Sequence, residues 1–269
     1  MSNRVKVMGV VNVTPDSFSD GGRFLAPDAA LAQARRLIED GVDILDIGAE
    51  STRPGSDPVS AQDEIARAVP LIEAIRAESA VAISIDTMKP EVARAAVAAG
   101  ANIWNDVAAL GFAPQGPEVA AELGCDVVLM HMRGEPRTMQ VEPRYDDVVA
   151  EVTTFLAARA EAAMSAGVAR EKIWLDPGVG FGKNLAHNLT LLANLDAFVA
   201  LGFPVLLGVS RKSFIAALHP PAKLAQDRLA GSLACALKGA DAGVAAVRVH
   251  DVAETVQALK VWRAIADAR

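Results

Sequence analysis

Short apolar runs alternate with longer amphipathic segments from one end of the chain to the other. Each run is dense in Val, Ile and Leu and closes on polar residues, as in residues 5–13 and 81–86. Between the runs, apolar residues recur at helical spacing; Leu31, Ala34 and Leu37 share one face of a predicted helix over residues 28–40. Continuous apolar strands separated by helices predict a parallel sheet that is covered by helices.

Strand–helix units of this kind account for the whole sequence. A (β/α)8 barrel typically needs about 250 residues, which this chain of 269 residues supplies. No linker or change of composition divides the units, so we predict one α/β domain over residues 1–269 with the TIM-barrel fold. The eight predicted strands cover residues 5–13, 43–48, 81–86, 102–106, 126–131, 172–176, 204–210 and 244–250.

Local signals place the starts of several helices. Ser60 followed by Asp63 is typical of a helix start, and Asp251 with Glu254 predicts a capping box for the last helix. The first helix is expected to begin near Pro27.

The connection after the first strand is long and polar. About a dozen residues separate Asn12 from the first predicted helix, whereas a strand-to-helix loop usually takes roughly 2–6. They include Asp16, Phe18 and Asp20, which offer charge and an aromatic face. Because an overlong loop is more often functional than decorative, we predict that this one belongs to a site.

Charge and composition narrow the possible functions. The formal net charge of −7 argues against a general nucleic-acid surface, because phosphate backbones require clustered Lys and Arg. Cys125 and Cys235 lie far apart without CxxC spacing, so neither a disulfide framework nor a zinc site is expected. The longest uncharged run, residues 197–210, is too short to span a membrane. With no signal peptide visible, we expect a cytoplasmic protein without membrane attachment.

The polar residues that close the apolar runs are the main functional signal. In a TIM barrel the C-terminal ends of the strands meet at one mouth, which holds the active site. A lone strand-end carboxylate often only caps a helix or ties a loop, and we expect such a supporting role for Asp46 and Asp106. The residues expected to converge on the mouth are Asn12, Asp46, Thr52, Arg53, Asp86, Asn105, Asp106, His131, Asp176, Ser210, Arg211, Lys212, Arg248 and His250.

These residue types suit a flat, partly anionic ligand. Asp86, Asn105 and Asp176 could accept hydrogen bonds from the N–H edge of a heterocycle deep in the barrel, and such donors would offset the cost of burying carboxylates. Asn12 with Asp16 could ligate Mg²⁺, which prefers a few protein oxygens with waters and phosphate oxygens. The side chains suited to anionic groups are Arg53, Lys212, Arg248 and His250.

Taken together, the strand ends resemble the dihydropteroate synthase family, the folate-pathway enzymes that sulfonamides inhibit. The resemblance follows the eight strands in order and covers essentially the whole chain, although residues 108–114 are less typical. The matching motifs include Asn12-Val13-Thr14-Pro15-Asp16, Ser51-Thr52-Arg53-Pro54-Gly55, Ser84-Ile85-Asp86-Thr87, Asn105-Asp106-Val107, Met130-His131-Met132, Asp176-Pro177-Gly178, Ser210-Arg211-Lys212 and Arg248-Val249-His250.

The resemblance implies a TIM-barrel transferase of folate biosynthesis that works with Mg²⁺ and is usually a homodimer. The implied reaction joins 4-aminobenzoate to 7,8-dihydropterin-6-ylmethyl diphosphate, giving 7,8-dihydropteroate and diphosphate. An arylamine is a weak nucleophile, so the pterin methylene must become cation-like as diphosphate departs, and Asp86 would favour that charge.

The resemblance also implies roles for individual residues. Asp86, Lys212, Arg248 and His250 would be catalytic, and Asn12 would be the metal ligand. The substrate-binding residues would be Asp16, Phe18, Thr52, Arg53, Pro54, Asp86, Asn105, Met130, Asp176, Phe181, Gly208, Ser210, Lys212, Arg248 and His250.

Two alternative functions share the pterin pocket. A pterin-binding methyltransferase of related barrel type would have no need of a metal–diphosphate site, so Asn12, Arg248 and His250 argue against it. A non-catalytic pterin-binding paralogue would be expected to lose residues of the first two loops. The presence of Phe18 and Thr52 argues against that alternative.

Overall fold

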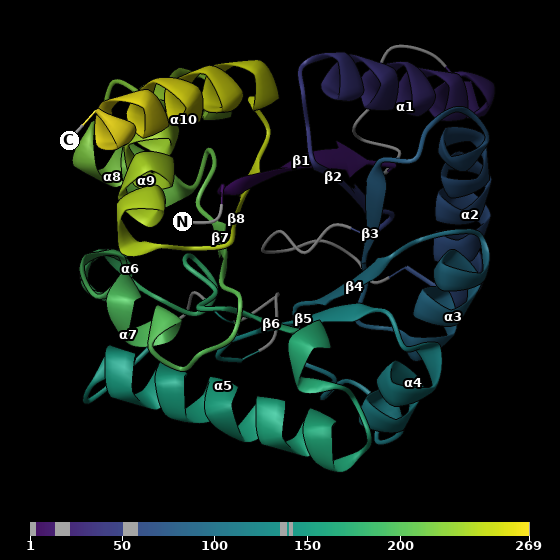
Figure 1. Ribbon diagram of the computed structural model, residues 1–269, viewed down its shortest axis with the longest axis horizontal. Helices are drawn as coiled ribbons and strands as arrows, with labels where there is room; N and C mark the ends of the chain where they lie inside the picture. The colour runs from purple at the N-terminus through teal and green to yellow at the C-terminus, as the bar shows by residue number, and fades with distance from the viewer. Residues whose placement is uncertain (1–3, 14–21, 51–58, 135–138, 140–141, 269) are drawn as a thin grey trace.

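Eight parallel strands occupy the centre of the structure, and helices surround them (Figure 1). The computed structural model describes residues 4–13, 22–50, 59–134, 139 and 142–268, with only the backbone described for residues 22–27. The strands are β1 (Lys6–Asn12), β2 (Ile44–Gly48), β3 (Ala82–Asp86), β4 (Ile103–Asp106), β5 (Asp126–Met130), β6 (Ile173–Asp176), β7 (Leu206–Gly208) and β8 (Ala246–Val249).

Helices follow the strands and form an outer ring (Figure 1). Among the described residues, none of them is both long enough and apolar enough to cross a membrane. The α-helices are α1 (Gly22–Glu39), α2 (Ala61–Glu78), α3 (Pro90–Ala98), α4 (Gly116–Leu123), α5 (Val148–Ser165), α6 (Leu185–Ala193), α7 (Leu195–Val199), α8 (Ser213–Leu218), α9 (Leu229–Ala242) and α10 (Val252–Asp267), with short 3₁₀ helices η2 (Arg170–Lys172) and η3 (Ala225–Arg228).

The sheet closes on itself, which confirms the predicted (β/α)8 barrel. The hydrogen-bonded order is β6-β5-β4-β3-β2-β1-β8-β7, so that β1 pairs with both β2 and β8. A parallel bridge between Leu175 and Val205 joins β6 to the residues before β7, and the Leu175 amide donates to the Pro204 carbonyl at 2.9 Å. All the strands therefore belong to one barrel and one domain.

Alternate residues of each strand face opposite sides, because the side-chain period of a strand is two. Outward residues such as Leu45, Ile47, Ile83 and Ile85 pack in the large core between strands and helices. Inward residues near the strand starts form a separate apolar plug. The members of this plug are Met8, Ile44, Ile103, Val128, Trp174, Leu206 and Ala246.

One predicted helix start is confirmed and another is wrong. Ser60 is the N-cap of α2, where its hydroxyl accepts from the Asp63 amide at 3.1 Å. The first helix begins at Gly22, well before Pro27, so proline does not mark its start. Helix α1 therefore begins within the stretch that the sequence predicts as the long first loop.

The predicted capping box at the start of α10 is also wrong. Asp251 is the N-cap residue, but its carboxylate makes no capping hydrogen bond. Instead it accepts from Arg211, with Nε–Oδ2 at 3.0 Å and a second contact through Nη2. A charged bidentate partner is a stronger attraction than a helix amide, and this pair joins the loops that follow β7 and β8.

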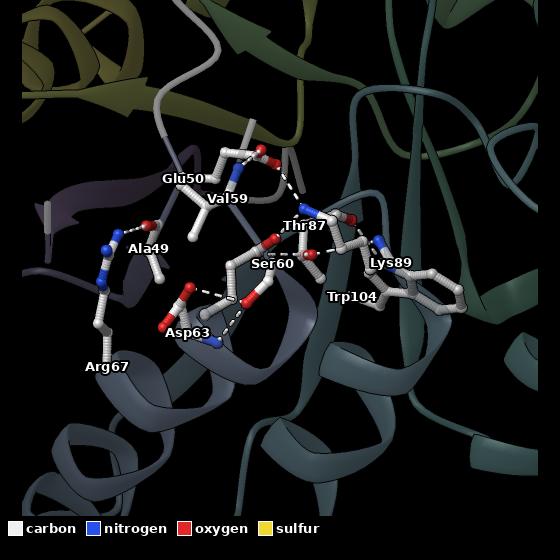
Figure 2. Close-up of polar contacts among 10 residues, drawn as sticks. Ala49, Glu50, Val59, Ser60, Asp63, Arg67, Thr87, Lys89 and Trp104 are labelled. Carbon is white, nitrogen blue, oxygen red and sulfur yellow. Dashed lines mark hydrogen bonds and ion pairs between the residues drawn. The ribbon is translucent and has the colours of Figure 1, made fainter. Parts of the chain in front are cut away.

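A buried ion-pair network braces the barrel rim beside β3 (Figure 2). Lys89 Nζ lies 2.8 Å from Glu50 Oε2 and also contacts the fully buried Glu64. Thr87 donates to Glu64 at 3.0 Å, and the Val59 amide donates to Glu50 at 2.7 Å. Burial raises the pKa of Glu64, against the opposing effect of Lys89. The network therefore needs the Lys89 charge to offset the burial of the Glu64 carboxylate.

Replacing Lys89 by Met is expected to lower the free energy of unfolding by about 3–5 kcal/mol, because removal of one partner leaves buried charge uncompensated. Lys238→Met, at an exposed position on α9, is the matched control and should change stability by less than about 0.5 kcal/mol. Urea unfolding of both variants measures the difference. Equal, small losses would show that the Lys89 network is no stronger than a surface ion pair.

Candidate active site

Most of the predicted strand-end residues that the structure describes lie at one mouth of the barrel, because they occupy inward positions near the ends of their strands. Five predicted residues, Asp16, Phe18, Thr52, Arg53 and Pro54, lie outside the described residues, so their placement stays a prediction. The strands bring seven of the described residues together around a common centre. These inward residues are Asn12 (β1), Asp86 (β3), Asn105 (β4), Met130 (β5), Asp176 (β6), Gly208 (β7) and Arg248 (β8).

Arg248 links the two sides of the mouth. Its Nε donates to Asp46 at 2.6 Å and its Nη2 donates to Asp86 at 2.8 Å. Burial raises the pKa of Asp86 to about 7, although Arg248 acts in the opposite direction. Burial also works against the charge of Arg248, but Asp46 and Asp86 raise its pKa above the usual value. The guanidinium is therefore a permanent cation, whereas Asp86 can change charge near neutral pH.

Asp46 supports the site from below, as the sequence predicted. Its carboxylate is fully buried and also lies 3.3 and 3.4 Å from Asn105 Nδ2. Because a carboxylate only accepts hydrogen bonds, it orients the Asn105 side chain with its NH₂ group toward Asp46 and its amide oxygen turned away from Asp46. One buried residue thus orients both Arg248 and Asn105.

Asp176 and Lys212 form the opposite wall. Asp176 accepts from the Gly178 amide at 2.7 Å, and burial raises the pKa of its carboxyl group. Lys212 Nζ lies 4.4 Å from the centre of the Phe181 ring and donates to the Val179 carbonyl. Burial lowers the pKa of Lys212 to about 8, although Asp176 opposes the shift. This wall combines an aromatic face, a cation and a carboxylate.

Two inward glycines keep the centre open. A Cβ atom on Gly48 would lie 3.4 Å from Asn12 Oδ1 and 3.7 Å from Asp86 Oδ2. A Cβ atom on Gly208 would lie 3.7 Å from Asp176 Oδ2. Any larger side chain would fill the space between these polar groups, so the two glycines leave room for a flat ligand among them.

Ser210 and His250 contact each other at the rim beyond β7 and β8. Ser210 Oγ accepts from the His250 amide at 3.2 Å and lies 3.1 Å from His250 Nδ1. Arg211 adopts the left-handed conformation (φ 59°), and its amide donates to Ser232 at 2.9 Å. The hydrogen bond from the Arg211 amide and the ion pair between Arg211 and Asp251 together fix the loop that carries Ser210.

The oxygen donors beside β1 fit a partial Mg²⁺ site. Asn12 is half-buried, and its amide oxygen faces the space that Gly48 leaves open next to Asp86. No group of three His, Cys, Asp or Glu side chains in the described part of the chain could hold a metal alone. Mg²⁺ commonly binds through one or two protein oxygens with phosphate oxygens and waters, which this donor set allows.

Two strand-end residues do not face the mouth. His131 follows the inward Met130, so its ring turns outward and packs edge-on against Phe155, with ring centres 4.9 Å apart. The expectation that His131 lines the mouth is therefore wrong. Asp106 turns outward for the same reason and accepts from the Ala108 and Leu110 amides, each at 2.7 Å, which confirms its supporting role.

Sequence reasoning missed two buried lysines that brace the site, Lys89 and Lys183. Their local sequences resemble those of exposed lysines, and their partners are distant in the chain: Glu50 for Lys89 and His131 for Lys183. For Lys183, the available signal was its place at the end of a Gly-rich segment.

Comparison with known proteins agrees with this geometry. The family described as "Pterin binding enzyme" matches residues 8–250, from β1 to the end of the mouth. Dihydropteroate synthase of Escherichia coli (strain K12) is 49% identical over 263 residues, covering 98% of this chain and 92% of the relative. A structure of Xanthomonas albilineans dihydropteroate synthase with 4-aminobenzoic acid is 51% identical, with a TM-score of 0.92 over 98% of this chain and 93% of that one.

The same Xanthomonas albilineans enzyme in complex with 7,8-dihydropteroate gives a TM-score of 0.88 at 48% identity, covering 98% of this chain and 95% of that chain. The family match, the identity along the whole barrel and the mouth described above agree with one another. The chain belongs to the pterin-binding enzyme family.

Proposed function

We propose that this chain is a dihydropteroate synthase, a transferase of folate biosynthesis (EC 2.5.1.15). It joins 4-aminobenzoate to 7,8-dihydropterin-6-ylmethyl diphosphate and releases diphosphate. The observation that carries the proposal is the arrangement of the mouth: β3, β4 and β6 supply acceptors inside the barrel, and β8 with the loop after β7 supplies cations beside them. Near-half identity to an enzyme of that name over 98% of the chain supports the same conclusion.

The acceptor side suits the pterin ring. Asp86, Asn105 and Asp176 would accept from its amino and ring N–H groups, which replaces the hydration that these buried groups lose. The aromatic ring of Phe181, with Lys212 over its face, offers a flat surface for the heterocycle. Met130, buried at the end of β5, would contribute an apolar contact.

The cationic side suits diphosphate. Arg248 uses two of its nitrogens to bind Asp46 and Asp86, and the remaining N–H groups of its planar head can donate to phosphate oxygens. His250, oriented by Ser210, would bind the same group. Mg²⁺, held by Asn12 and phosphate oxygens, would supply positive charge to the leaving diphosphate.

The chemistry requires charge stabilisation more than proton abstraction. The bond between the pterin methylene and diphosphate oxygen breaks with its electron pair leaving on diphosphate, and the arylamine nitrogen then bonds to the methylene and loses a proton. Ionised Asp86 would stabilise the positive charge on the pterin. By family resemblance, Asp16, Phe18, Thr52, Arg53 and Pro54, together with Ser210 and Lys212, would surround 4-aminobenzoate.

We also propose that the partner of the chain is a second copy of itself. Helices α8, α9 and α10 lie together on one side of the barrel (Figure 1), and large apolar side chains are exposed there. Val261 and Ile265, four residues apart on α10, are 56% and 60% exposed, and Leu218 and Leu224 lie at the end of α8 and after it. An apolar group of this kind is typical of an interface. The cytoplasmic location stays a prediction.

The decisive assay follows diphosphate release from the purified protein with the pterin diphosphate, 4-aminobenzoate and Mg²⁺. Release is expected only when 4-aminobenzoate is present, and chelation of Mg²⁺ should abolish it, because diphosphate would then leave without its main counter-charge. A pterin-binding paralogue would bind the pterin without this release. Release that does not depend on 4-aminobenzoate would contradict the proposed function.

Asp86→Asn should lower turnover by more than tenfold, since a loss of about 1.4 kcal/mol in transition-state stabilisation already gives that factor. With the pKa of Asp86 near 7, wild-type turnover should fall as pH drops from about 8 to 6 and the carboxylate takes up a proton. The Asp86→Asn variant should not show this fall in turnover, because it has no carboxyl group to take up the proton. Asp196→Asn, at an exposed position on α7, is the control, and a wild-type rate in Asp86→Asn would exclude the electrostatic role.

Ile265→Asp should raise the dissociation constant of the dimer at least tenfold, because it places a charge in the proposed apolar interface. Analytical ultracentrifugation over a concentration series measures it. Phe112→Asp, at an exposed position after β4, is the control and should leave the dimer intact. A monomeric wild-type protein, or equal effects of both changes, would rule out this interface.

A further inference from the structure

Lys183 is a buried cation surrounded by backbone oxygens. It directly precedes the Asn184 cap of α6, and only 2% of its surface is exposed. Its Nζ lies 2.9 Å from the carbonyl oxygens of both Gly178 and Phe181, 3.3 Å from the His131 carbonyl and 2.9 Å from His131 Nδ1. The ammonium therefore connects the Gly-rich loop after β6 to the loop after β5.

The chemistry of these contacts defines the state of His131. A lysine ammonium only donates, so His131 Nδ1 must accept and the ring proton must lie on Nε2. Burial lowers the pKa of His131 to about 3, and Lys183 adds to the shift. Burial also lowers the pKa of Lys183 to about 7, while its three carbonyl partners stabilise the donor form. His131 is thus a neutral acceptor that helps to hold Lys183.

The Gly-rich loop curls around this ammonium. Gly178 (φ 64°) and Gly182 (φ 63°) are left-handed, and a Cβ atom would lie 1.9 Å from the His131 carbonyl at the first position and 2.3 Å from the Arg133 carbonyl at the second. Only glycine permits such close approach of two backbones. Lys183 donates to the loop at Gly178 and Phe181, on either side of Val179, so it holds the curl from inside.

The outer side of the same curl forms one wall of the mouth. The Gly178 amide donates to Asp176, the Val179 carbonyl accepts from Lys212, and the Phe181 ring lies under the Lys212 ammonium. A shift of the curl would therefore move the acceptor, the cation and the aromatic face at the same time. Arg248 donates to Asp46 and Asp86, and His250 contacts Ser210, so these hydrogen bonds lie outside the curl.

We propose that Lys183 is a positioning residue for pterin binding: its ammonium sets the Gly-rich loop so that Asp176, Phe181 and Lys212 meet the flat ring. The proposal rests on the proposed function, because it takes this wall to be the pterin face. A lysine that merely stabilised the barrel would affect all ligands alike, whereas a positioning residue should affect the ring and spare diphosphate.

The test compares Lys183→Met with the wild-type protein and with the exposed control Lys238→Met. Calorimetry measures binding of 6-hydroxymethylpterin and, separately, of inorganic diphosphate with Mg²⁺. Lys183→Met should weaken pterin binding at least tenfold and change diphosphate binding less than twofold, since it leaves backbone acceptors unpaired only behind the ring-facing loop. Steady-state kinetics should show a higher KM for the pterin diphosphate.

Lys183→Gln provides a second, milder variant if Lys183→Met does not fold. Its carboxamide keeps two N–H donors in place of three, so a smaller loss confined to pterin is expected. Wild-type pterin affinity in the variants that fold, or equal losses for pterin and diphosphate, would overturn the positioning role.

A further control separates this inference from the proposed function. Wild-type protein must bind the pterin and Asp176→Asn must bind it more weakly. If either condition fails, the pterin pocket itself is misassigned. If both hold and Lys183→Met still binds pterin like the wild type, only the role of Lys183 is wrong.

Discussion

The two-residue alternation of a closed parallel barrel is the constraint on which this site depends. A residue at the end of a strand reaches the mouth only if it has inward parity, and the residue next to it must face the helices. Met130 and His131 show the consequence within one step of the chain: the first faces the mouth, and the second packs on Phe155. Asn105 and Asp106 divide in the same way, one toward Asp46 and the other toward its own loop. The barrel thus separates ligand-facing groups from supporting groups by parity alone.

Buried charge is the second constraint, because each ion that leaves water must find partners in the protein. Arg248 meets this requirement with two carboxylates, Lys89 with two glutamates, and Lys183 with carbonyl oxygens and a neutral histidine ring. These three arrangements differ in whether the cation keeps hydrogen-bond donors for a ligand. The first lies within the mouth and keeps further donors for a ligand, whereas the other two lie behind the mouth and fix the backbone that forms it.

The sequence predicted the barrel and most of the described mouth because both depend on local patterns. An apolar run followed by a polar residue identifies a strand and its end, and eight such units specify the closure. Pairings between distant loops have no such signal: Asp251 has the spacing of a helix cap, yet Arg211, forty positions away, takes its carboxylate. The burial of Lys183 also has no local sequence signal, because it arises only when the loop after β6 folds against the loop after β5. The side that a strand-end residue faces, as for His131, has no signal in a continuous apolar run, because such a run shows no alternation of apolar and polar residues.

The charges around the mouth explain why a cation-like substrate suits it. Among the described residues, Arg248 donates to Asp46 and Asp86, and the charge of Lys212 acts on Asp176. Burial still raises the pKa of Asp86 and Asp176, because these charges do not fully compensate the loss of water. A ligand that donates hydrogen bonds or gains positive charge at this point stabilises the ionised form of the buried carboxyl groups. This stabilisation increases as the positive charge develops. Arg248 lies at the end of β8 and His250 directly beyond it, where both can meet a departing anion. The barrel therefore separates the two charges that heterolysis creates, with positive charge held beside the inward carboxylates and negative charge drawn to the rim.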